Sequence, residues 1–259
     1  MKKFVLKRVL ISIVLLFFVT MIIYGIMRCM PTSFVENKAR ELAQKPGSKT
    51  YQEWKEQLDE AYGLDSGVVQ GYCHWASQAV RGQFGDSWYW NKPVLDKFAE
   101  VIWYSFALGL ASFILEIIIA IPAGIAAARR QYSALDYTIT VIALIGISLP
   151  SFFFATILKW VFSIKLGWVD LYGIVGRMHD QMSPIGQILD MAQHMILPTI
   201  TLSIVSIGSL MRYTRTNMLE VLNADFIRTA RAKGLSENRV INHHAFRNTL
   251  IPIITLLGG

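Results

Sequence analysis

The feature that most constrains this chain is a set of apolar runs long enough to cross a lipid bilayer. A helix needs about 20 consecutive apolar residues to span the hydrocarbon core, and a soluble domain of 259 residues rarely carries several such runs. Apolar residues make up 53% of the chain, which favours the membrane class. We therefore expect an all-α integral membrane protein, a multi-span helical bundle with spans at about residues 9–30, 101–128, 137–162 and 195–211.

The first and last apolar runs need separate treatment. The first run follows a basic tail, as a signal peptide does, but it is too long, and Cys29-Met30-Pro31 is not a small-residue cleavage site, so we expect a retained helix. A fifth run, residues 249–259, is too short to cross a bilayer. It predicts that the sequence stops inside a helix, with a truncated C-terminus.

The positions of the lysines and arginines predict the orientation of the spans, because short basic loops stay on the cytoplasmic side. The basic regions are the N-terminal tail with Lys2, Lys3, Lys7 and Arg8, the pair Arg129-Arg130, and segment 212–247. They are every other loop, so the N-terminus is predicted to be cytoplasmic and segments 31–98 and 164–194 to lie outside. The net charge of +7 then reflects this bias, with membrane lipid and not nucleic acid as the partner.

The long outer segment reads as a small helical insertion. Residues 36–62 have helical spacing broken at Pro46-Gly47, Gly63 is a plausible stop, and a second helix is expected over residues 68–80, followed by a turn over residues 82–87. The insertion could be a structured loop that separates two spans, or a docking surface for an extracellular partner, and both readings stay open. Segment 164–194, with several glycines and Pro184, is expected to be an irregular loop.

Segment 216–250 predicts two helices joined by a tight turn. The first helix is expected from Thr216 to Lys233, Gly234 stands where a left-handed residue ends a helix, and Ser236 is a suitable N-cap for a second helix to Thr249. Pro252 would fall in the first turn of the next span. One helix face carries an apolar stripe of Val221, Leu222, Phe226, Ile227 and Ala230.

The apolar stripe must be buried against something, and three candidates exist. The first is the protein's own helix bases or the lipid surface, and the second is a groove on a soluble partner. The third is DNA, since the segment is basic and has a glycine turn. A segment tethered to spans at both ends would hold a recognition helix near the membrane, which argues against DNA.

Few residues indicate chemistry of their own. The chain has no phosphate-binding loop, so it is not expected to hydrolyse ATP itself. His243 and His244 are adjacent and would point about 100° apart on a helix, so no metal site or other cofactor is expected. Glu116 lies midway along the second span, where a carboxylate faces a bundle interior, a subunit interface or a water path. We take it as a candidate for the substrate path, or as a carboxyl paired with a neighbouring helix.

The residues from Glu220 to Pro252 resemble the cytoplasmic loop of ABC importer permeases of the dipeptide/oligopeptide group. Ala230, Ala232, Gly234, Leu250 and Pro252 stand at the matching places. Similarity extends over nearly the whole chain, including Gly63-Leu64-Asp65, Phe84-Gly85, Gly146 to Pro150 and His194 to Pro198. The chain departs from the family's Pro-Gly-Asp-Pro after the first helix, where it has Pro31-Thr32-Ser33-Phe34.

The resemblance implies a type I importer permease with three parts: residues 1–30 as tail and first span, residues 31–98 as the extracytoplasmic insertion, and residues 99–259 as the permease core. Its partners would be ATP-binding cassette ATPase subunits, a second homologous permease and an extracytoplasmic solute-binding protein. Segment 214–248 would couple to the ATPase, through Phe226, Arg228, Ala230, Arg231, Ala232, Gly234, Leu235 and Ser236.

The resemblance implies that the solute is a peptide, with nickel or glutathione as alternatives within the same family. Two other classes are weighed against this. A secondary transporter would carry several intramembrane carboxylates, whereas Glu116 alone lies deep in a predicted span. A membrane-tethered DNA-binding regulator would need exposed polar residues on a recognition helix.

Overall fold

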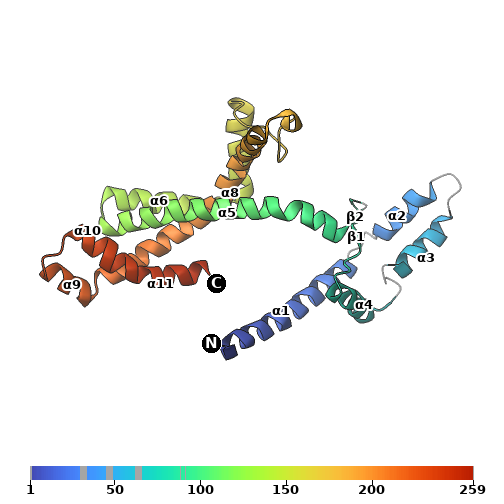
Figure 1. Cartoon of the computed structure of the whole chain (residues 1–259), viewed down its shortest axis with the longest axis horizontal. Helices are drawn as coiled ribbons and strands as arrows, with labels where there is room; N and C mark the ends of the chain where they lie inside the picture. The colour runs from blue at the N-terminus through green and yellow to red at the C-terminus, as the bar shows by residue number, and fades with distance from the viewer. Residues whose placement is uncertain are drawn as a thin grey trace. The chain divides into compact units, whose positions relative to one another are not determined.

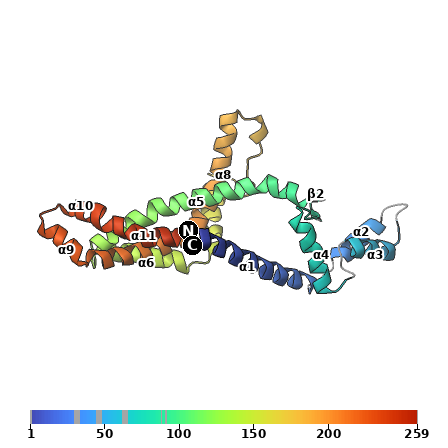
Figure 2. The same cartoon turned by 60° about the horizontal axis from the view of Figure 1, so that its bottom comes forward.

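A computed structural model describes residues 2–29, 34–44, 49–61, 66–87, 89–90 and 92–258, which divide into two compact units, residues 1–100 and 101–259. The described part is almost entirely helical, as predicted; the strands found there are two residues long each. Figure 1 and Figure 2 show the chain from two sides. The predicted helix break at Pro46-Gly47 and the stop at Gly63 lie outside the described residues.

The first unit consists of four helices and a short hairpin. The elements are α1 (Lys2–Arg28), α2 (Phe34–Ala43), α3 (Tyr51–Ala61), α4 (Val68–Val80), β1 (Asp86–Ser87) and β2 (Lys92–Pro93). Helix α4 has the bounds expected from the sequence. The predicted turn over residues 82–87 begins with Gly82 in the left-handed region, φ 79°, but its end forms β1, which pairs antiparallel with β2.

Tyr72 fastens α4 to α1. Its hydroxyl lies 2.9 Å from the hydroxyl of Thr20 and donates to the carbonyl of Phe17 at 3.2 Å. Its ring makes edge contacts with Phe17 and Tyr24, and Arg28 donates to the carbonyl of Ser66. Helix α2 packs on α3, and Val35 and Ala39 of α2 are fully buried.

The second unit is a helical bundle with a helix–turn–helix at one end. Helix α5 (Val94–Arg129) begins in the first unit and continues in the second. The remaining elements are α6 (Ala134–Ser148), α7 (Ser151–Leu158), the π-helix η1 (Lys159–Lys165), the 3₁₀ turn η2 (His179–Gln181), α8 (Pro184–Leu222), α9 (Asp225–Ala232), α10 (Glu237–Arg239), the π-helix η3 (Val240–Ala245) and α11 (Phe246–Leu257).

The third apolar run is not one straight span. It is split into α6 and the α7–η1 helix, which meet at an angle of 103°. The cause is Pro150, which has no N–H to donate and forces the residue before it out of helical conformation. Leu149 accordingly has φ −78° and ψ 127°. Pro122 and Pro198, by contrast, lie inside the continuous helices α5 and α8.

Helix α8 is much longer than the fourth apolar run from which it was predicted. It has 39 residues, so the expected irregular loop 164–194 ends at Ser183 and the span does not stop at residue 211. Ser183 caps the helix by accepting from the N–H of Gly186 at 3.3 Å. Pro184 had been counted as a loop residue, but it occupies the first helical position, where its missing N–H costs nothing.

Glycines allow the bundle helices to pack closely. A Cβ on Gly124 of α5 would lie 2.7 Å from the carbonyl oxygen of Met211 in α8, and one on Gly208 would lie 2.6 Å from the carbonyl oxygen of Ala143 in α6. The bundle core lies where α5, α6, α8 and α11 meet, around Ala120, Ala143, Ile207, Leu210, Met211 and Ile253. Ala120 and Gly124 thus provide small-residue contacts on α5.

Among the described residues, three helices are long and apolar enough to cross a membrane: α1, α5 and α8. The bent pair of α6 with α7–η1 makes a fourth candidate if it counts as one broken span. Helix α1 carries an apolar surface whose side chains are mostly exposed, as from Leu10 to Phe18. Such a surface is stable in hydrocarbon and not in water.

Candidate functional site

The turn at Gly234 joins α9 to α10. Gly234 has φ 75°, so the predicted left-handed residue is confirmed, and its N–H donates to the carbonyl of Arg231 at 2.9 Å. A Cβ at this position would meet no heavy atom within 4 Å. The requirement for glycine therefore comes from the backbone conformation and not from lack of space.

The first helix of the pair is not the continuous helix predicted from Thr216 to Lys233. Helix α8 ends at Leu222, and Ala224 is extended, with φ −72° and ψ 150°. The side-chain amide of Asn223 donates to the carbonyl of Leu219 at 2.9 Å and so offers that group an alternative to a helical partner. The short helix α9 is therefore a separate element.

The second helix of the pair continues into the next long helix. Ser236 stands at the N-cap with extended backbone, but its side chain makes no capping hydrogen bond. Helical structure then runs through α10, η3 and α11 without interruption, so the predicted end at Thr249 is wrong. Pro252 lies in the middle of α11 and not in a first turn.

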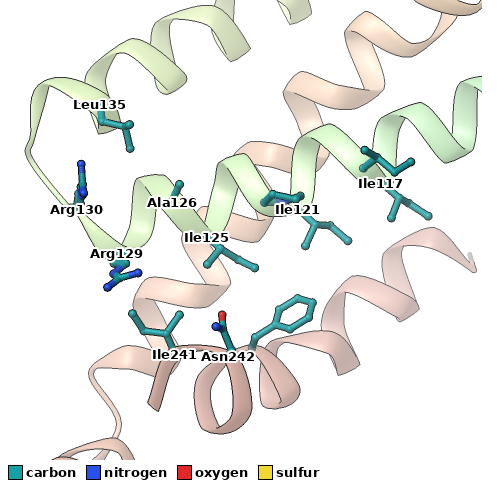
Figure 3. Close-up of a pocket in the computed structure, with 12 residues that line it drawn as sticks. Ile117, Ile121, Ile125, Ala126, Arg129, Arg130, Leu135, Ile241 and Asn242 are labelled. Atoms are coloured by element: carbon teal, nitrogen blue, oxygen red, sulfur yellow. The ribbon is translucent and has the colours of Figure 1, made fainter. Parts of the chain in front are cut away.

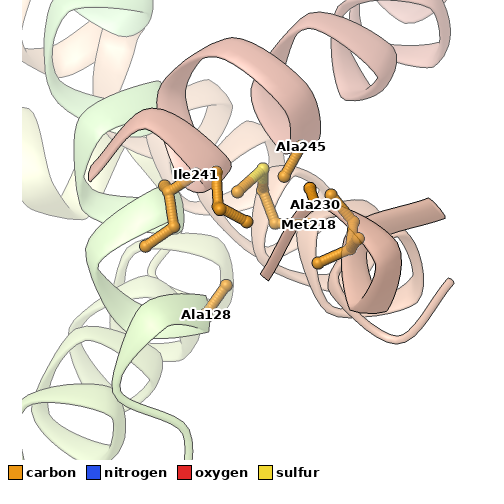
Figure 4. Packing of buried hydrophobic residues seen from close by; sticks show 7 residues of the cluster. Ala128, Met218, Ala230, Ile241 and Ala245 are labelled. Carbon is orange, nitrogen blue, oxygen red and sulfur yellow. The ribbon is translucent and has the colours of Figure 1, made fainter. Parts of the chain in front are cut away.

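A cluster of buried side chains fastens the helix pair to the ends of the longer helices (Figure 4). We call this cluster the buried seam; it consists of Ala128, Met218, Ile227, Ala230, Val240, Ile241 and Ala245. It draws on α5, α8, α9 and η3, and the partly buried Leu235 packs against it. Because this apolar surface is removed from water, the turn is held in place by packing and is not a loose loop.

The remaining predicted site residues face outward. Phe226 is 46% exposed, and the Arg228 side chain is 74% exposed with Asp225 at 3.5 Å as its ion-pair partner. Ala232, Gly234 and Ser236 are also exposed. The predicted stripe placed Phe226 with Ile227 and Ala230; these two side chains are buried in the chain's own core, whereas Phe226 of the same helix is not. We call Phe226, Arg228, Ala232 and Gly234 the outer face.

Arg231 and Glu237 form a bidentate ion pair across the turn. The guanidinium donates to the two carboxylate oxygens at 3.2 Å and 2.7 Å. Hydrogen bonding from Arg231 lowers the pKa of Glu237, and the nearby charge of Arg129 lowers it further. The pKa of Arg231 is raised by the same hydrogen bonds. This pair, which sequence reasoning did not identify, closes the turn from the outside.

A buried ion pair ties α8 to the start of α6. Arg215 donates from Nε to one oxygen of Asp136 at 2.5 Å and from its terminal nitrogen to the other at 2.7 Å, and the Tyr132 N–H also donates to Asp136 at 2.9 Å. The Asp136 side chain is 3% exposed. Sequence reasoning did not single out Asp136. Ser133 followed by an acidic residue three positions later is nevertheless the pattern of a capping box, which marks the start of a helix.

An apolar groove of about 890 Å³ lies beside the helix pair (Figure 3). Isoleucines of α5, among them Ile117, Ile121 and Ile125, form one wall, and Ile241 with Asn242 of η3 lies across from them. Arg129 and Arg130 stand at one end. One flank of η3 is therefore open toward α5.

Glu116 is half-buried on α5. Within the described part of the chain, its carboxylate has no hydrogen bond or ion pair. The bundle therefore does not show the paired carboxyl that was one of the two expectations, and the substrate-path role stays a prediction.

Comparison with known proteins identifies the family to which this chain belongs. Residues 120–259, more than half of the chain, match the family described as binding-protein-dependent transport system inner membrane component. The oligopeptide transport system permease protein AppB of Bacillus subtilis is 38% identical over 259 residues, which cover all of this chain and 78% of that relative.

Two further relatives differ in the solute that their names give. The oligopeptide transport system permease protein OppB of Salmonella typhimurium is 36% identical, and the glutathione transport system permease protein GsiC of Escherichia coli is 33% identical. Both alignments cover all of this chain, and 78% and 77% of those proteins. The resemblance first seen in residues 220–252 is confirmed, and this chain belongs to the binding-protein-dependent transport system inner membrane component family.

Proposed function

We propose that this chain is a permease subunit that carries peptides across the membrane by alternating access, driven by ATP hydrolysis in partner subunits. The observation that carries the proposal is the helix pair at Gly234. Its inner face is fixed to α5, α8 and η3 through the buried seam, while its outer face carries an exposed aromatic ring and an exposed guanidinium. An aromatic anchor beside an arginine is typical of a protein interface.

In this proposal the helix pair receives the motion of the ATPase. Closure of the motor subunits displaces the outer face, which lies in a cleft of the partner, and the seam transmits the displacement to the bundle. Packed elements move as rigid bodies in such transitions. Phe226 and Arg228 make the contact, whereas Ala230 and Leu235 hold the pair to the bundle.

The assembly we propose contains two permeases, two ATPase subunits and an extracytoplasmic solute-binding protein. The N-terminus and the helix pair lie on the cytoplasmic side, and residues 31–98 lie outside, because the basic residues lie in alternate loops. The substrate path passes Glu116, whose half-buried carboxylate suits a solvated route better than a lipid-facing surface.

Peptides are favoured as the solute by the names of the relatives AppB and OppB. Glutathione, itself a small peptide, is the second candidate, and the relative GsiC supports it. Nickel remains an alternative from the family resemblance alone. A secondary transporter and a DNA-binding regulator both lose support, since the chain belongs to the inner membrane component family of binding-protein-dependent transport systems.

The proposal is tested by reconstituting the permease with its ATPase partners and binding protein in vesicles. We expect uptake of a labelled dipeptide that requires ATP, and loss of most of this uptake in Phe226→Ala, with the permease still in the membrane. The exposed Phe153→Ala on α7 is the matched control and should transport normally. Uptake driven by an ion gradient without ATP would overturn the proposal.

A further inference from the structure

A second cavity, of about 450 Å³, lies inside the second unit and away from the helix pair. Its walls come from Leu108 of α5, Ala155 of α7, Lys159 of η1, the loop 169–173, and the stretch of α8 from His194 to Leu202. Its volume is within the range of small-molecule sites, which are mostly apolar with a few placed polar groups.

The backbone is irregular on three sides of this cavity. Lys159 begins a π-helix, a conformation that is frequent at functional sites. Gly173 has φ 101°. Pro198 has no N–H and so cannot donate the ordinary helical bond to the carbonyl of His194. Interrupted helices that free polar backbone groups are a recurring feature of solute sites in transporters.

The cavity carries one charge of each sign. Asp170 supplies a carboxylate that is 65% exposed, and its Oδ2 lies 3.2 Å from Nε2 of His194. The His194 ring is 4% exposed and is itself fixed by its Nδ1, which lies 2.8 Å from the carbonyl oxygen of Asp190. Lys159 holds its ammonium 4.4 Å from the centre of the Tyr172 ring. Both charged groups are therefore positioned by neighbours and not left to move freely.

We propose that this cavity binds the two charged ends of a short peptide during its passage, an inference that rests on the proposed function. The ammonium end lies at Asp170 and the carboxylate end at Lys159, while Leu108, Leu197 and Leu202 contact an apolar side chain. A zwitterion fits this lining because each of its charges meets an opposite one. A simple cation or anion would meet only one of the two protein charges and would therefore form only one of the two ion pairs.

The site is tested by equilibrium binding to the permease–ATPase complex purified without its binding protein. The probes are labelled alanyl-leucine, its N-acetyl form and its C-terminal amide. We expect wild type to bind the free dipeptide about tenfold more tightly than either blocked form. Asp170→Asn should weaken binding of the free dipeptide about tenfold but leave binding of the N-acetyl form unaffected. Lys159→Gln should weaken binding of the free dipeptide about tenfold but leave binding of the C-terminal amide unaffected.

The control variants Asp180→Asn and Arg177→Gln remove exposed charges from the same loop outside the cavity, and should leave all three affinities unchanged. Asp170→Glu, which keeps the charge, should restore discrimination against the N-acetyl probe. The site would be overturned if wild type bound the three probes equally, or if it bound none of them at millimolar concentrations. It would also be overturned if the variants lost affinity equally for the free and the blocked dipeptides.

ATP-driven uptake of alanyl-leucine by the complete importer is measured alongside. If wild type takes up the dipeptide but binds the free and blocked forms equally, the site is overturned and the proposed function stands. Absence of any peptide uptake overturns the proposed function as well.

Discussion

At the scale of single residues, Gly234 and the pair Arg231–Glu237 set the geometry of the turn between α9 and α10. Gly234 adopts a backbone conformation that costs other residues about 1–2 kcal/mol. The ion pair spans the same turn on its exposed side. Phe226 and Arg228 lie on the outer face, where a change alters contact with a partner more than folding.

Replacement of Gly234 by valine should uncouple transport while the protein stays in the membrane. A β-branched side chain disfavours the left-handed conformation, so the turn shifts and the outer face is displaced. Peptide uptake and ATP hydrolysis in vesicles measure the effect: uptake falls while hydrolysis persists. Gly109→Ala, in a helix where a Cβ also meets nothing within 4 Å, is the control and should behave as wild type. Normal uptake in the valine variant would refute the coupling role.

Reversal of the charge at Arg228 should weaken association with the ATPase subunit. Its guanidinium is 74% exposed, so its loss disturbs little within the chain. Arg231→Glu should weaken association too, but with a local defect, because it would put two carboxylates together at Glu237. Co-purification of the ATPase measures both effects, and Arg177→Glu in the loop before α8 is the control. Unchanged co-purification of Arg228→Glu would remove this residue from the interface.

The Arg231–Glu237 pair predicts a modest dependence of the turn on pH. The pKa of Glu237 is lowered in the folded protein, so its contribution is complete above the ordinary carboxyl pKa and is lost as pH falls through the lowered value. Since both side chains are about half exposed, the contribution is at most about 1 kcal/mol. The hydrogen-exchange protection factors of residues 231–237, which correct for the intrinsic pH dependence of exchange, should be constant from neutral to mildly acidic pH and fall below that range. Glu237→Gln should abolish the acid-dependent part.

At the scale of elements, the Asp136–Arg215 pair fixes α8 against the start of α6. Asp136→Ala leaves the Arg215 guanidinium, only 24% exposed, without its carboxylate. Loss of one partner of a buried pair costs about 3–5 kcal/mol, and the partial exposure of Arg215 places this case at the lower end. A large drop in Tm of the detergent-solubilised complex should follow. The double variant Asp136→Ala with Arg215→Met should be more stable than Asp136→Ala alone, and equal Tm values would contradict the pairing argument.

The local elements could be predicted from the sequence, whereas their relations at a distance could not. Helix α4 and the glycine turn follow from spacing and residue type within a few positions. The bend at Pro150 was not resolved because apolar composition is the same on both sides of it. The Asp136–Arg215 pair joins residues 79 positions apart, and no local pattern connects them.

The candidate site was predicted as one segment with an apolar face, but the residues of the two faces were not all assigned correctly. The eight named residues do lie around one turn, yet Ala230 and Leu235 pack inward and Phe226 points outward. The missing information was which of these residues contact α5, α8 and η3, because those contacts join positions far apart in the sequence. The helix break at Asn223-Ala224 was also missed. Asparagine followed by alanine is a weak stop signal, so the longer helix was the simpler reading of the sequence.

At the scale of the whole molecule, the proposed topology predicts which faces of the membrane expose which segments. In a variant with Cys29 and Cys73 replaced by serine, a cysteine introduced in place of Arg228 should react with an impermeant maleimide only after the membrane is permeabilised, so that the reagent reaches the cytoplasmic side. A cysteine at Trp168, exposed in the loop before α8, should react from the outside. Labelling of position 228 from the exterior would reverse the orientation and remove the basis for coupling to an ATPase.

Helix α8 forms a wall of the second cavity from His194 to Leu202 and also supplies Met218 to the buried seam. One continuous helix therefore takes part in both places. If nucleotide binding by the partner changes the affinity of that cavity for its solute by some factor, the solute must change the partner's affinity for nucleotide by the same factor. Binding of solute from one side of the bilayer would thus change the fraction of the partner that has nucleotide bound on the other side.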